Sequence, residues 1–534
     1  MKFLQVLQQR AKSNPQDDAL RICNEYDSQE ICWQELYERV HNTALLLQNL
    51  GVSPGNRVGL LAENSLDWIL VDLACHYLHA VSVPINTHLS SQQVSRQIRH
   101  SGASLLFVSG EFYSVLDQGP AIPVVILGRT DGTTAEQLMP VLGNFDEMVV
   151  SASTLDRELA IPCRESERVA SIVYTSGTTG EAKGVMLTEE NLVFDAQMAL
   201  RRYQFEPDTH QFNFLPFFYV FGRTCDLYVW LLGGHRLTLA SSRKKAVEEV
   251  GVIAPTHING VPHFFQKLAT LCTQSSSNDG VLGSNLSQIN SGGSALARDV
   301  FDFYQANSIA VLEGYGLTET SPVATLTGPN DIRDASVGCA IEGTEIKLSE
   351  DGEVLIKGRH VCAGYYRDAQ ATADLICDGW LRTGDLGRLD EDQFLYLTGR
   401  KKELIVTSGG QNIWPQSIEE ILLEHDAIEQ AIVFGDGQKF LTAILFPDWE
   451  YFSEQVDVSG TSDHWKDSPN VERWFMQIVN KQLEHRASYE QIARIALLSL
   501  PFSVEQQQLT VKGTLRRSVI KEQLVDVLDR LYSS

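Results

Sequence analysis

Helical and strand-like patterns of apolar residues alternate over the first part of the chain. Residues 33–50 carry apolar side chains at helical spacing, and the continuous apolar run 58–62 follows. The helical pattern 66–79 and the apolar run 80–85 repeat this order. Strands that alternate with helices are typical of crossover connections and a largely parallel sheet. The pattern continues in a helix at 92–100 and in strands at 104–108, 169–174, 236–240, 286–291 and 310–313.

The pattern changes after residue 337. Short alternating segments with glycine turns, at 345–348, 352–357 and 393–398, predict a β-rich portion. After residue 399, a helix at 415–423 and strands at 430–434 and 441–446 predict a compact α+β unit, and the polar stretches 273–285 and 455–468 are predicted loops. We therefore expect an α/β protein. Its large composite N-terminal domain, 1–399, has mainly parallel sheets plus a β-rich part, and its small C-terminal domain, 400–534, is α+β.

Composition and charge exclude several classes of protein. The 534 residues are 43% hydrophobic, with 43 Lys and Arg against 68 Asp and Glu and a net charge of −25. An acidic chain is not built to neutralise nucleic-acid phosphates. No run approaches the roughly 18 apolar residues of a membrane span, and polar residues interrupt the N-terminal segment early, unlike a secretory signal. The nine cysteines contain no CxxC pair, so neither a disulfide framework nor a zinc site is indicated, and a cytoplasmic location is expected.

The segment YTSGTTGEAKG at 174–184 has the composition of a phosphate-binding loop. Glycine lets backbone N–H groups turn toward a ligand, hydroxyls add donors, and lysine adds charge. The spacing does not satisfy the Walker A pattern, and composition alone leaves a second interpretation, a flexible Gly/Ser/Thr turn. The positions concerned are Thr175, Ser176, Gly177, Thr178, Thr179, Gly180 and Lys183.

Five segments together resemble the motifs of the adenylate-forming superfamily, which contains acyl-CoA synthetases, peptide-synthetase adenylation domains and luciferases. The first is the loop at 174–184. The others are SGGSA at 291–295, EGYGLTET at 313–320, GWLRTGD at 379–385, and GRKKELI at 399–405 with GGQNIWP at 409–415. The motifs occur in the family's order, and the resemblance spans nearly the whole chain. LPFFYVF at 215–221, followed by Arg223-Thr224, and the segment 400–408 most resemble the long-chain fatty acyl-CoA synthetases.

The resemblance implies a two-step reaction. A carboxylic acid, expected to be a fatty acid, reacts with ATP to give an acyl-adenylate and pyrophosphate, and coenzyme A then takes the acyl group and releases AMP. Because the first step brings a carboxylate toward a polyanion, cationic groups, Mg²⁺ and backbone donors must offset the repulsion. An acyl carrier protein is an alternative acceptor. Peripheral contact with a membrane is compatible with a long-chain substrate.

The resemblance also assigns roles to residues. The loop at 174–184 would hold the phosphates, and Glu319 would ligate Mg²⁺ with a hydroxyl of Thr178 or Thr318 nearby. Tyr315 would stack on adenine, and Asp385 would accept hydrogen bonds from the ribose. Beyond the loop, the residues expected to bind ATP or AMP are Gly293, Ser294, Ala295, Glu313, Gly314, Tyr315, Gly316, Thr318, Asp385 and Arg400.

Other positions concern the second step and the acid. Lys402 occupies the position at which family members rotate the small domain between an adenylation and a thioester-forming arrangement. Ser408, Gly409 and Gly410 would approach the pantetheine arm of coenzyme A, although a Gly-Gly pair is also a common turn. The aromatic run within 215–221 would lie beside the acyl entrance, and a buried core strand is the simpler interpretation.

Three positions depart from the family pattern. Ala182 stands where proline is usual before the loop lysine, and Tyr219 stands where histidine is usual beside the reacting carboxylate. Tyrosine lacks the charge that imidazole carries near neutral pH. Near the C-terminus, LTVKGTLRR at 509–517 places Thr514 at the position of the family's catalytic lysine, and Lys512 lies two residues away. Loss of one pre-positioned charge typically lowers the rate by about 10²–10³.

Two interpretations of Thr514 stay open. Either Lys512 reaches the site from a rearranged loop, or adenylation is weak or absent and the chain binds nucleotide or acyl-adenylate, or performs only the thioester step. We expect a working enzyme because the rest of the ATP site matches the family. The expected catalytic residues are Lys512, the Thr514 position, Tyr219 and Glu319. A carrier protein as acceptor would need a local basic patch, for which the candidates are Lys512, Arg516, Arg517 and Lys521.

Overall fold

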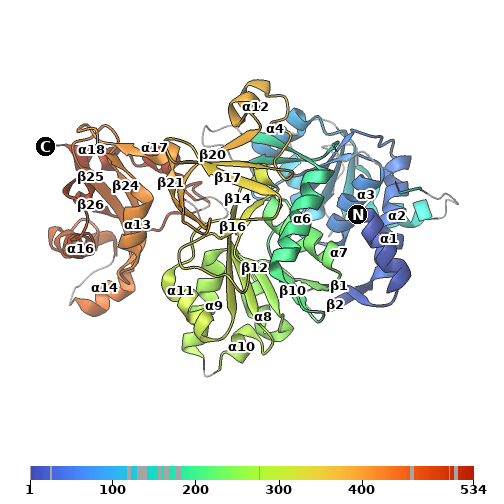
Figure 1. Ribbon diagram of the computed structural model, residues 1–534, viewed down its shortest axis with the longest axis horizontal. Helices are drawn as coiled ribbons and strands as arrows, with labels where there is room; N and C mark the ends of the chain where they lie inside the picture. The colour runs from blue at the N-terminus through green and yellow to red at the C-terminus, as the bar shows by residue number, and fades with distance from the viewer. Residues whose placement is uncertain are drawn as a thin grey trace. The chain divides into compact units, whose positions relative to one another are not determined.

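The computed structural model describes residues 2–24, 27–116, 122–128, 141–153, 159–161, 167–175, 182–275, 277–456, 462–503, 505–509 and 515–533. The chain divides into two compact units, whose elements are labelled in Figure 1. The larger unit comprises Met1–Lys347, Leu355–Arg382 and Asp390–Leu395, and the smaller comprises Leu348–Val354, Thr383–Leu389 and Tyr396–Ser534. The domain boundary expected between residues 399 and 400 stays a prediction.

Two large sheets organise the larger unit. The strands of the nine-stranded sheet are β1 (Asp18–Cys23), β2 (Ser28–Cys32), β10 (His210–Asn213), β11 (Arg236–Leu239), β12 (His257–Gly260), β13 (Gln288–Gly292), β14 (Ala310–Gly316), β15 (Val323–Leu326) and β16 (Cys339–Ala340). The strands of the seven-stranded sheet are β3 (Arg57–Leu61), β4 (Val81–Pro84), β5 (Leu105–Ser109), β6 (Val124–Leu127), β7 (Val141–Asn144), β8 (Val169–Thr175) and β9 (Lys183–Thr188).

Both sheets are mainly parallel, as the alternation of helices and strands predicts. The orders are β16-β15-β14-β13-β12-β10-β11-β1-β2 and β7-β6-β5-β3-β4-β8-β9. In the first sheet the pairs from β14 through to β1 are parallel, and β2, β15 and β16 add antiparallel edges. In the second sheet only the edge pair β8–β9 is antiparallel among the described strands. The predicted α/β class is confirmed.

The larger unit contains helices, some of which pack on the two faces of these sheets. They are α1 (Phe3–Ser13), α2 (Trp33–Asn49), α3 (Leu66–Tyr77), α4 (Ser91–Ser101), η1 (Gly110–Leu116), α5 (Phe145–Ser153), α6 (Glu189–Tyr203), the π-helix η2 (Gly222–Tyr228), α7 (Val229–Gly233), α8 (Ala246–Ile253), α9 (Pro262–Gln274), α10 (Asp279–Leu282), α11 (Arg298–Ala306), η3 (Thr318–Thr320) and α12 (Ala369–Leu375).

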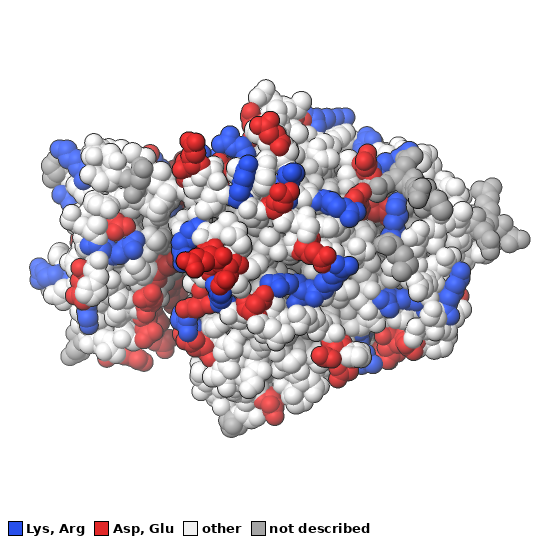
Figure 2. Space-filling model, viewed as in Figure 1, with Lys and Arg blue, Asp and Glu red and all other residues white. Residues whose placement is uncertain are grey.

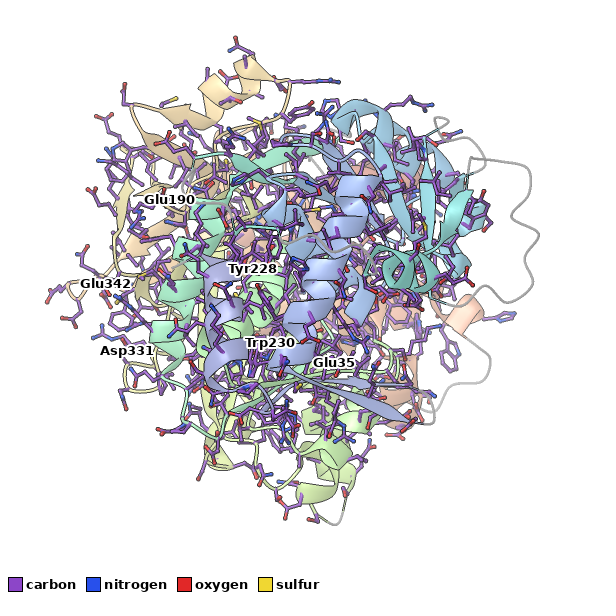
Figure 3. The ribbon with its side chains drawn as sticks, turned by 90° about the vertical axis from the view of Figure 1, so that its right-hand side faces the viewer. Glu35, Glu190, Tyr228, Trp230, Asp331 and Glu342 are labelled. Carbon is purple, nitrogen blue, oxygen red and sulfur yellow. The ribbon has the colours of Figure 1, made fainter. Side chains whose placement is uncertain are left out.

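Alternate residues of the strands enter different cores. In β5, Leu105 and Phe107 join a core that α2, α3, α6 and α7 share with strands of both sheets. The intervening Leu106 and Val108 pack instead with α4 and η1. Figure 3 shows Tyr228 and Trp230, which belong to the shared core, inside the unit, whereas Glu190 and Glu342 lie at its edge. Strands buried on both faces are typical of parallel sheets.

The β-rich portion and the smaller unit follow the predicted order. The strands after residue 340 are β17 (Thr344–Leu348), β18 (Glu353–Gly358), β19 (Ile376–Cys377), β20 (Trp380–Leu389) and β21 (Leu395–Arg400). The later elements are η4 (Lys401–Glu403), β22 (Ile405–Val406), β23 (Asn412–Ile413), α13 (Pro415–Leu423), β24 (Ile428–Phe434), β25 (Leu441–Pro447), α14 (Trp449–Gln455), α15 (Ser462–Trp465), α16 (Pro469–Gln482), η5 (Ser488–Glu490), β26 (Ile492–Leu497), α17 (Arg517–Gln523) and α18 (Val525–Tyr532).

The three-stranded sheet β24-β25-β26 is the centre of the smaller unit. In β24, Ala431 and Val433 join a core with α13 and α16, and the intervening Ile432 and Phe434 join a core with α17 and α18. Successive residues of a strand point to opposite faces, so helices cover the sheet on both sides, as Figure 1 shows. The predicted α+β pattern is confirmed.

Three predicted segments differ in the structure. Short helices, α10 and α15, lie within the predicted loops 273–285 and 455–468. Apolar side chains anchor them: Leu282 packs in the core beside α8 and α9, and Trp465 packs against Trp449. The core strand suggested for residues 215–221 is wrong, because the chain folds back there: a Cβ on Gly222 would lie 2.8 Å from the carbonyl oxygen of Leu215. Among the described residues, no helix is long and apolar enough to cross a membrane.

Candidate active site

Strands β8 and β9 form a hairpin that carries both ends of the predicted phosphate loop. Thr175 pairs with Lys183 in the antiparallel register, so the ends of the connecting segment are held together at the edge of the sheet. Ser176, Gly177, Thr178, Thr179 and Gly180 lie outside the described residues. Thr175 and Lys183 are both half-buried. Their roles toward phosphate stay predictions.

Lys183 belongs to a cluster with Tyr365 and Glu319. The Nζ atom of Lys183 lies 4.7 Å from the centroid of the Tyr365 ring, and the Tyr365 hydroxyl donates to Oε1 of Glu319 at 2.7 Å. Burial, together with the carboxylate of Glu319, raises the pKa of Tyr365, so the phenol stays a donor at neutral pH. The structure therefore brings together the loop lysine and the predicted magnesium ligand.

Tyr365 is a site residue that the sequence did not predict. It is placed by backbone hydrogen bonds to β9: the N–H of Tyr366 donates to Gly184 at 2.7 Å, and the N–H of Met186 donates to Gly364 at 2.9 Å. The available signal is the pair of tyrosines that follows Gly364 in a polar stretch. Nothing in their local pattern indicates that Glu319 lies beside them, because that contact depends on the path of the chain.

The donors around Glu319 fit a magnesium ion. Glu319 and Thr318, both half-buried, lie in the single turn η3 and offer a carboxylate and a hydroxyl. Hard oxygen donors are those that Mg²⁺ prefers, and it commonly binds through one or two carboxylates plus nucleotide phosphates and water. Within the described ranges no group of three or more His, Cys, Asp or Glu side chains is arranged to hold a metal. Phosphate oxygens would therefore complete the coordination.

The predicted adenine residues meet at the ends of two neighbouring parallel strands. Gly292 of β13 pairs with Gly314 of β14, so the exposed segment 293–295 leaves its strand at the edge where the buried Tyr315 follows Gly314. Gly316 has no room for a side chain, because a Cβ there would lie 1.6 Å from the carbonyl oxygen of Pro322. This edge brings together Gly293, Ser294, Ala295, Glu313, Gly314, Tyr315 and Gly316.

Glu313 is the titratable group of this edge. Burial raises the pKa of its carboxyl to about 7, while a hydrogen bond from the backbone N–H of Leu296 opposes the rise. The bond ties the loop after β13 to β14. Glu313 is therefore partly protonated near neutral pH.

Tyr219 is half-buried and accepts a hydrogen bond from Nδ2 of Asn86 at 3.2 Å. Burial raises the pKa of the phenol to about 12, so at neutral pH it supplies a hydroxyl without charge. Phe221, two residues after Tyr219, packs against β13, because a Cβ added to Gly292 of that strand would lie 3.1 Å from the Phe221 ring. Asn86 is a second residue that the sequence did not predict.

In the smaller unit, two of the residues expected to bind ATP or AMP are paired with each other. Nε of Arg400 lies 2.9 Å from Oδ1 of the buried Asp385. The preceding Gly384 has a positive φ of 71° and donates its N–H to Glu353 at 3.0 Å, which fixes the turn before Asp385. Lys402 is exposed in η4. Its hinge role stays a prediction.

Ser408, Gly409 and Gly410 form the exposed turn between β22 and β23. The N–H of Ser408 donates to Gln438 at 2.8 Å, and Gly410 has φ of 78°, a conformation that favours glycine. The turn interpretation fits this geometry, and a role toward coenzyme A stays a prediction. Lys512 and Thr514 lie outside the described residues.

The basic patch suggested for a carrier protein is wrong at Arg517. Its guanidinium donates to both carboxylate oxygens of Glu419, at 2.8 and 3.0 Å, and to the carbonyl oxygen of Val433 at 2.7 Å. On the larger unit, cations and anions lie interspersed over the face in Figure 2. Ion pairs of the larger unit include Arg201 with Glu342, 2.6 Å apart. Arg517 therefore stabilises the smaller unit instead of offering charge to a partner.

Comparison with known proteins decides the family. A family model described as AMP-binding enzyme matches residues 7–366, and one described as AMP-binding enzyme C-terminal domain matches residues 402–534. The chain belongs to the AMP-binding enzyme family. The predicted resemblance to adenylate-forming enzymes is confirmed.

The relatives in this family are named as ligases. The long-chain-fatty-acid–CoA ligase FadD15 of Mycobacterium bovis is 28% identical over 94% of this chain and 92% of its own. The 2-succinylbenzoate–CoA ligase of Bacillus mycoides is 30% identical over 80% of this chain and 84% of its own. At the level of the family, the prediction of an acid–thiol ligase is confirmed.

A solved structure confirms the fold of this AMP-binding enzyme. It is the o-succinylbenzoate coenzyme A synthetase of Bacillus subtilis, in complex with ATP and magnesium ion. The similarity has a TM-score of 0.74 and 23% identity, over 96% of this chain and 98% of that chain. The two-part α/β architecture is therefore that of a known AMP-binding enzyme.

Proposed function

We propose that this AMP-binding enzyme activates a carboxylic acid with ATP and transfers the acyl group to coenzyme A. The observation that carries the proposal is the cluster of Lys183, Tyr365 and Glu319 beside the ends of the phosphate loop. A cation, a phenolic donor and a carboxylate gathered beside this loop suit the binding of a triphosphate with its metal ion. The named relatives, both coenzyme A ligases, support the same reaction class.

The residues of the site have complementary tasks in this proposal. Lys183 offsets phosphate charge as the acid approaches, and Glu319, held by Tyr365, would ligate Mg²⁺. When bound, magnesium would neutralise charge on the phosphates of ATP while the adenylyl group passes to the acid and pyrophosphate leaves. Tyr219 offers an uncharged hydroxyl, so the cation that draws in the carboxylate has to come from elsewhere. Lys512 is the candidate for that cation.

We propose a fatty acid as the substrate. FadD15, whose alignment covers 94% of this chain at 28% identity, is named for long-chain fatty acids. The segment 215–221 is rich in aromatic residues. Phe217 and Phe218 are buried, whereas Tyr219 and Phe221 are half-buried. Such a segment suits an apolar chain beside a polar head group.

Acid-dependent pyrophosphate release tests this function. The enzyme with ATP and Mg²⁺ is supplied with fatty acids of increasing length and with aromatic acids such as 2-succinylbenzoate. We expect release with fatty acids, and acyl-CoA formation when coenzyme A is added. Nucleotide binding without release for any acid would contradict the proposal and favour a non-catalytic binding role. Release without transfer to coenzyme A, but with transfer to an acyl carrier protein, would identify the alternative acceptor.

The Lys512→Ala variant tests whether this lysine replaces the one absent at Thr514. We expect pyrophosphate release to fall by about 10²-fold, the usual loss for one pre-positioned charge. Lys521→Ala, which removes an exposed lysine of α17, is the control. Unchanged release by Lys512→Ala would refute compensation.

A further inference from the structure

Asp226 is a fully buried carboxylate on which three side-chain amides converge. Its Oδ1 accepts hydrogen bonds from Gln211 and from Asn259, both at 2.6 Å, and its Oδ2 accepts one from Asn213 at 2.5 Å. Asp226 lies in the π-helix η2, whereas its partners lie in β10 and β12. Local π-helical turns are frequent at functional sites. Burial raises the pKa of Asp226 to about 7, and the amide hydrogen bonds oppose the rise.

One branch of the network reaches the aromatic segment 215–221. Nδ2 of Asn213 also donates to the carbonyl oxygen of Leu215 at 3.0 Å. Nδ2 of Asn64 donates to the same oxygen and to Oδ1 of Asn213, each at 2.7 Å, and Oδ1 of Asn64 accepts from the N–H of Phe217 at 2.8 Å. The amides therefore fix the backbone of this segment at two points.

The other branch reaches β13, the strand that leads to the segment 293–295, which is expected to bind the nucleotide. Oδ1 of Asn259 accepts from Nδ2 of Asn290 at 3.1 Å, and Nδ2 of Asn290 also donates to the hydroxyl of Tyr203 at 2.9 Å. Asn290 lies in β13, two residues before Gly292. The branches meet again at Gly292, whose Cβ position lies 3.1 Å from the ring of Phe221.

We propose that Asp226 is a positioning residue that holds the aromatic segment 215–221 and the end of β13 in register, so that acid and nucleotide are recognised together. The inference rests on the proposed function, because that function gives the two segments their ligands. A carboxylate accepts from every side, whereas an amide has one accepting and one donating end. Replacement by asparagine places an N–H against at least one of the three donors, and it removes the negative charge that strengthens the hydrogen bonds of the others, so both branches are weakened.

Hydrogen exchange tests the positioning without any substrate. In Asp226→Asn we expect faster exchange, by about tenfold, in peptides covering both 214–221 and 288–295, since the hydrogen bonds of both branches lose their charged acceptor. In Asn64→Ala only the first peptide should exchange faster. Asp195→Asn is the matched control, because Asp195 is equally buried but accepts its hydrogen bond from the N–H of Val323 in β15. Wild-type exchange in Asp226→Asn, or equal acceleration in Asp195→Asn, would overturn the proposal.

Kinetics test the consequence for recognition. Asp226→Asn should raise the KM of the acid and that of ATP by about tenfold each, and Asn64→Ala should raise only that of the acid. A merely structural role would lower kcat through a smaller active fraction and leave both KM values unchanged, and that result would overturn the link to recognition. If the wild type releases no pyrophosphate with any acid, the proposed function fails, while the exchange pattern still decides the positioning role.

Discussion

At the scale of single residues, the candidate site depends on a few side chains whose partners set their chemistry. Tyr365 is a donor because its hydroxyl faces the carboxylate of Glu319 at 2.7 Å. Asp385 and Arg400 form a pair, so a ribose hydroxyl would meet a carboxylate that already has a cationic partner. The protein has a net charge of −25, so a polyanionic ligand such as ATP needs cationic side chains at its own binding site. Lys183 and Arg400 are such cations at the candidate site.

Lys183→Met tests the cation of the phosphate loop. Methionine keeps the length of the side chain beside Tyr365 but removes the charge. We expect acid-dependent pyrophosphate release to fall by about 10²-fold. Lys267→Met, on the exposed face of α9, serves as the control. Equal activity of the two variants would exclude a role for Lys183 in ATP use.

The pKa of Glu313 predicts a pH-dependent stability. Because burial raises this pKa from 4.5 to about 7, the folded state holds the proton more tightly than the unfolded state. The contribution of the protonated Glu313 carboxyl to the free energy of unfolding is complete below the unfolded pKa of 4.5. It is lost as the pH rises through the folded pKa of about 7. The free energy of unfolding of the wild type, relative to Glu313→Gln, should therefore fall by about 1–2 kcal/mol between pH 4.5 and pH 8 in urea titrations. A pH-independent difference would contradict this assignment.

At the scale of elements, strand pairing assembles the site. The hairpin β8–β9 holds Thr175 and Lys183 opposite each other, and the parallel pair β13–β14 places two loops side by side. Ligands of α/β proteins bind beyond the carboxyl ends of parallel strands, where both loops of the second pair lie. The elements thus explain why motifs far apart in the chain meet.

Gly316→Ala tests how tightly the end of β14 is packed. The new Cβ would lie 1.6 Å from the carbonyl oxygen of Pro322, so backbone has to move. We expect a loss of about 1–3 kcal/mol in the free energy of unfolding, together with weaker ATP binding measured by calorimetry. Gly280→Ala is the matched control, because its Cβ position has no neighbour within 4 Å. Similar effects of the two changes would show that packing at Gly316 is unimportant.

At the scale of the whole molecule, the chain consists of two compact units, each with its own core. The smaller unit has a sheet covered on both faces and an ion pair between half-buried Arg517 and buried Glu419. Exposed Lys402 lies just after the last strand of the β-rich portion. We propose that it is the hinge at which the predicted C-terminal domain, residues 400–534, rotates between the arrangements for the two half-reactions.

Lys402→Pro tests the hinge. Proline fixes φ and limits rotation, whereas Lys402→Ala removes the same side chain and leaves the backbone free. We expect Lys402→Pro to retain pyrophosphate release and to lower acyl-CoA formation by about tenfold or more, with Lys402→Ala close to wild type in both assays. Equal loss of both half-reactions in Lys402→Pro would contradict a hinge at this position.

The local pattern of the sequence predicted most elements because helices and strands depend on neighbouring residues. Helix α13 occupies the predicted range 415–423, and β8 ends where the phosphate loop was expected to begin. The segment 215–221 was an exception, as were the predicted loops 273–285 and 455–468, which contain α10 and α15. The aromatic residues of 215–221 suggested a strand, but the chain turns there and packs Gly222, the first residue of the π-helix η2, against Leu215.

The sequence by itself determined the fold class, the family motifs and the residue types at the candidate site, since these depend on composition and local spacing. Only the tertiary structure decided which side chains meet. Glu319 finds Tyr365 across 46 positions, and Asp226 joins amides from two strands and through them Asn64 and Asn290. Such contacts form because the sheets bring distant segments together, and no local pattern of hydrophobic and polar residues specifies that path.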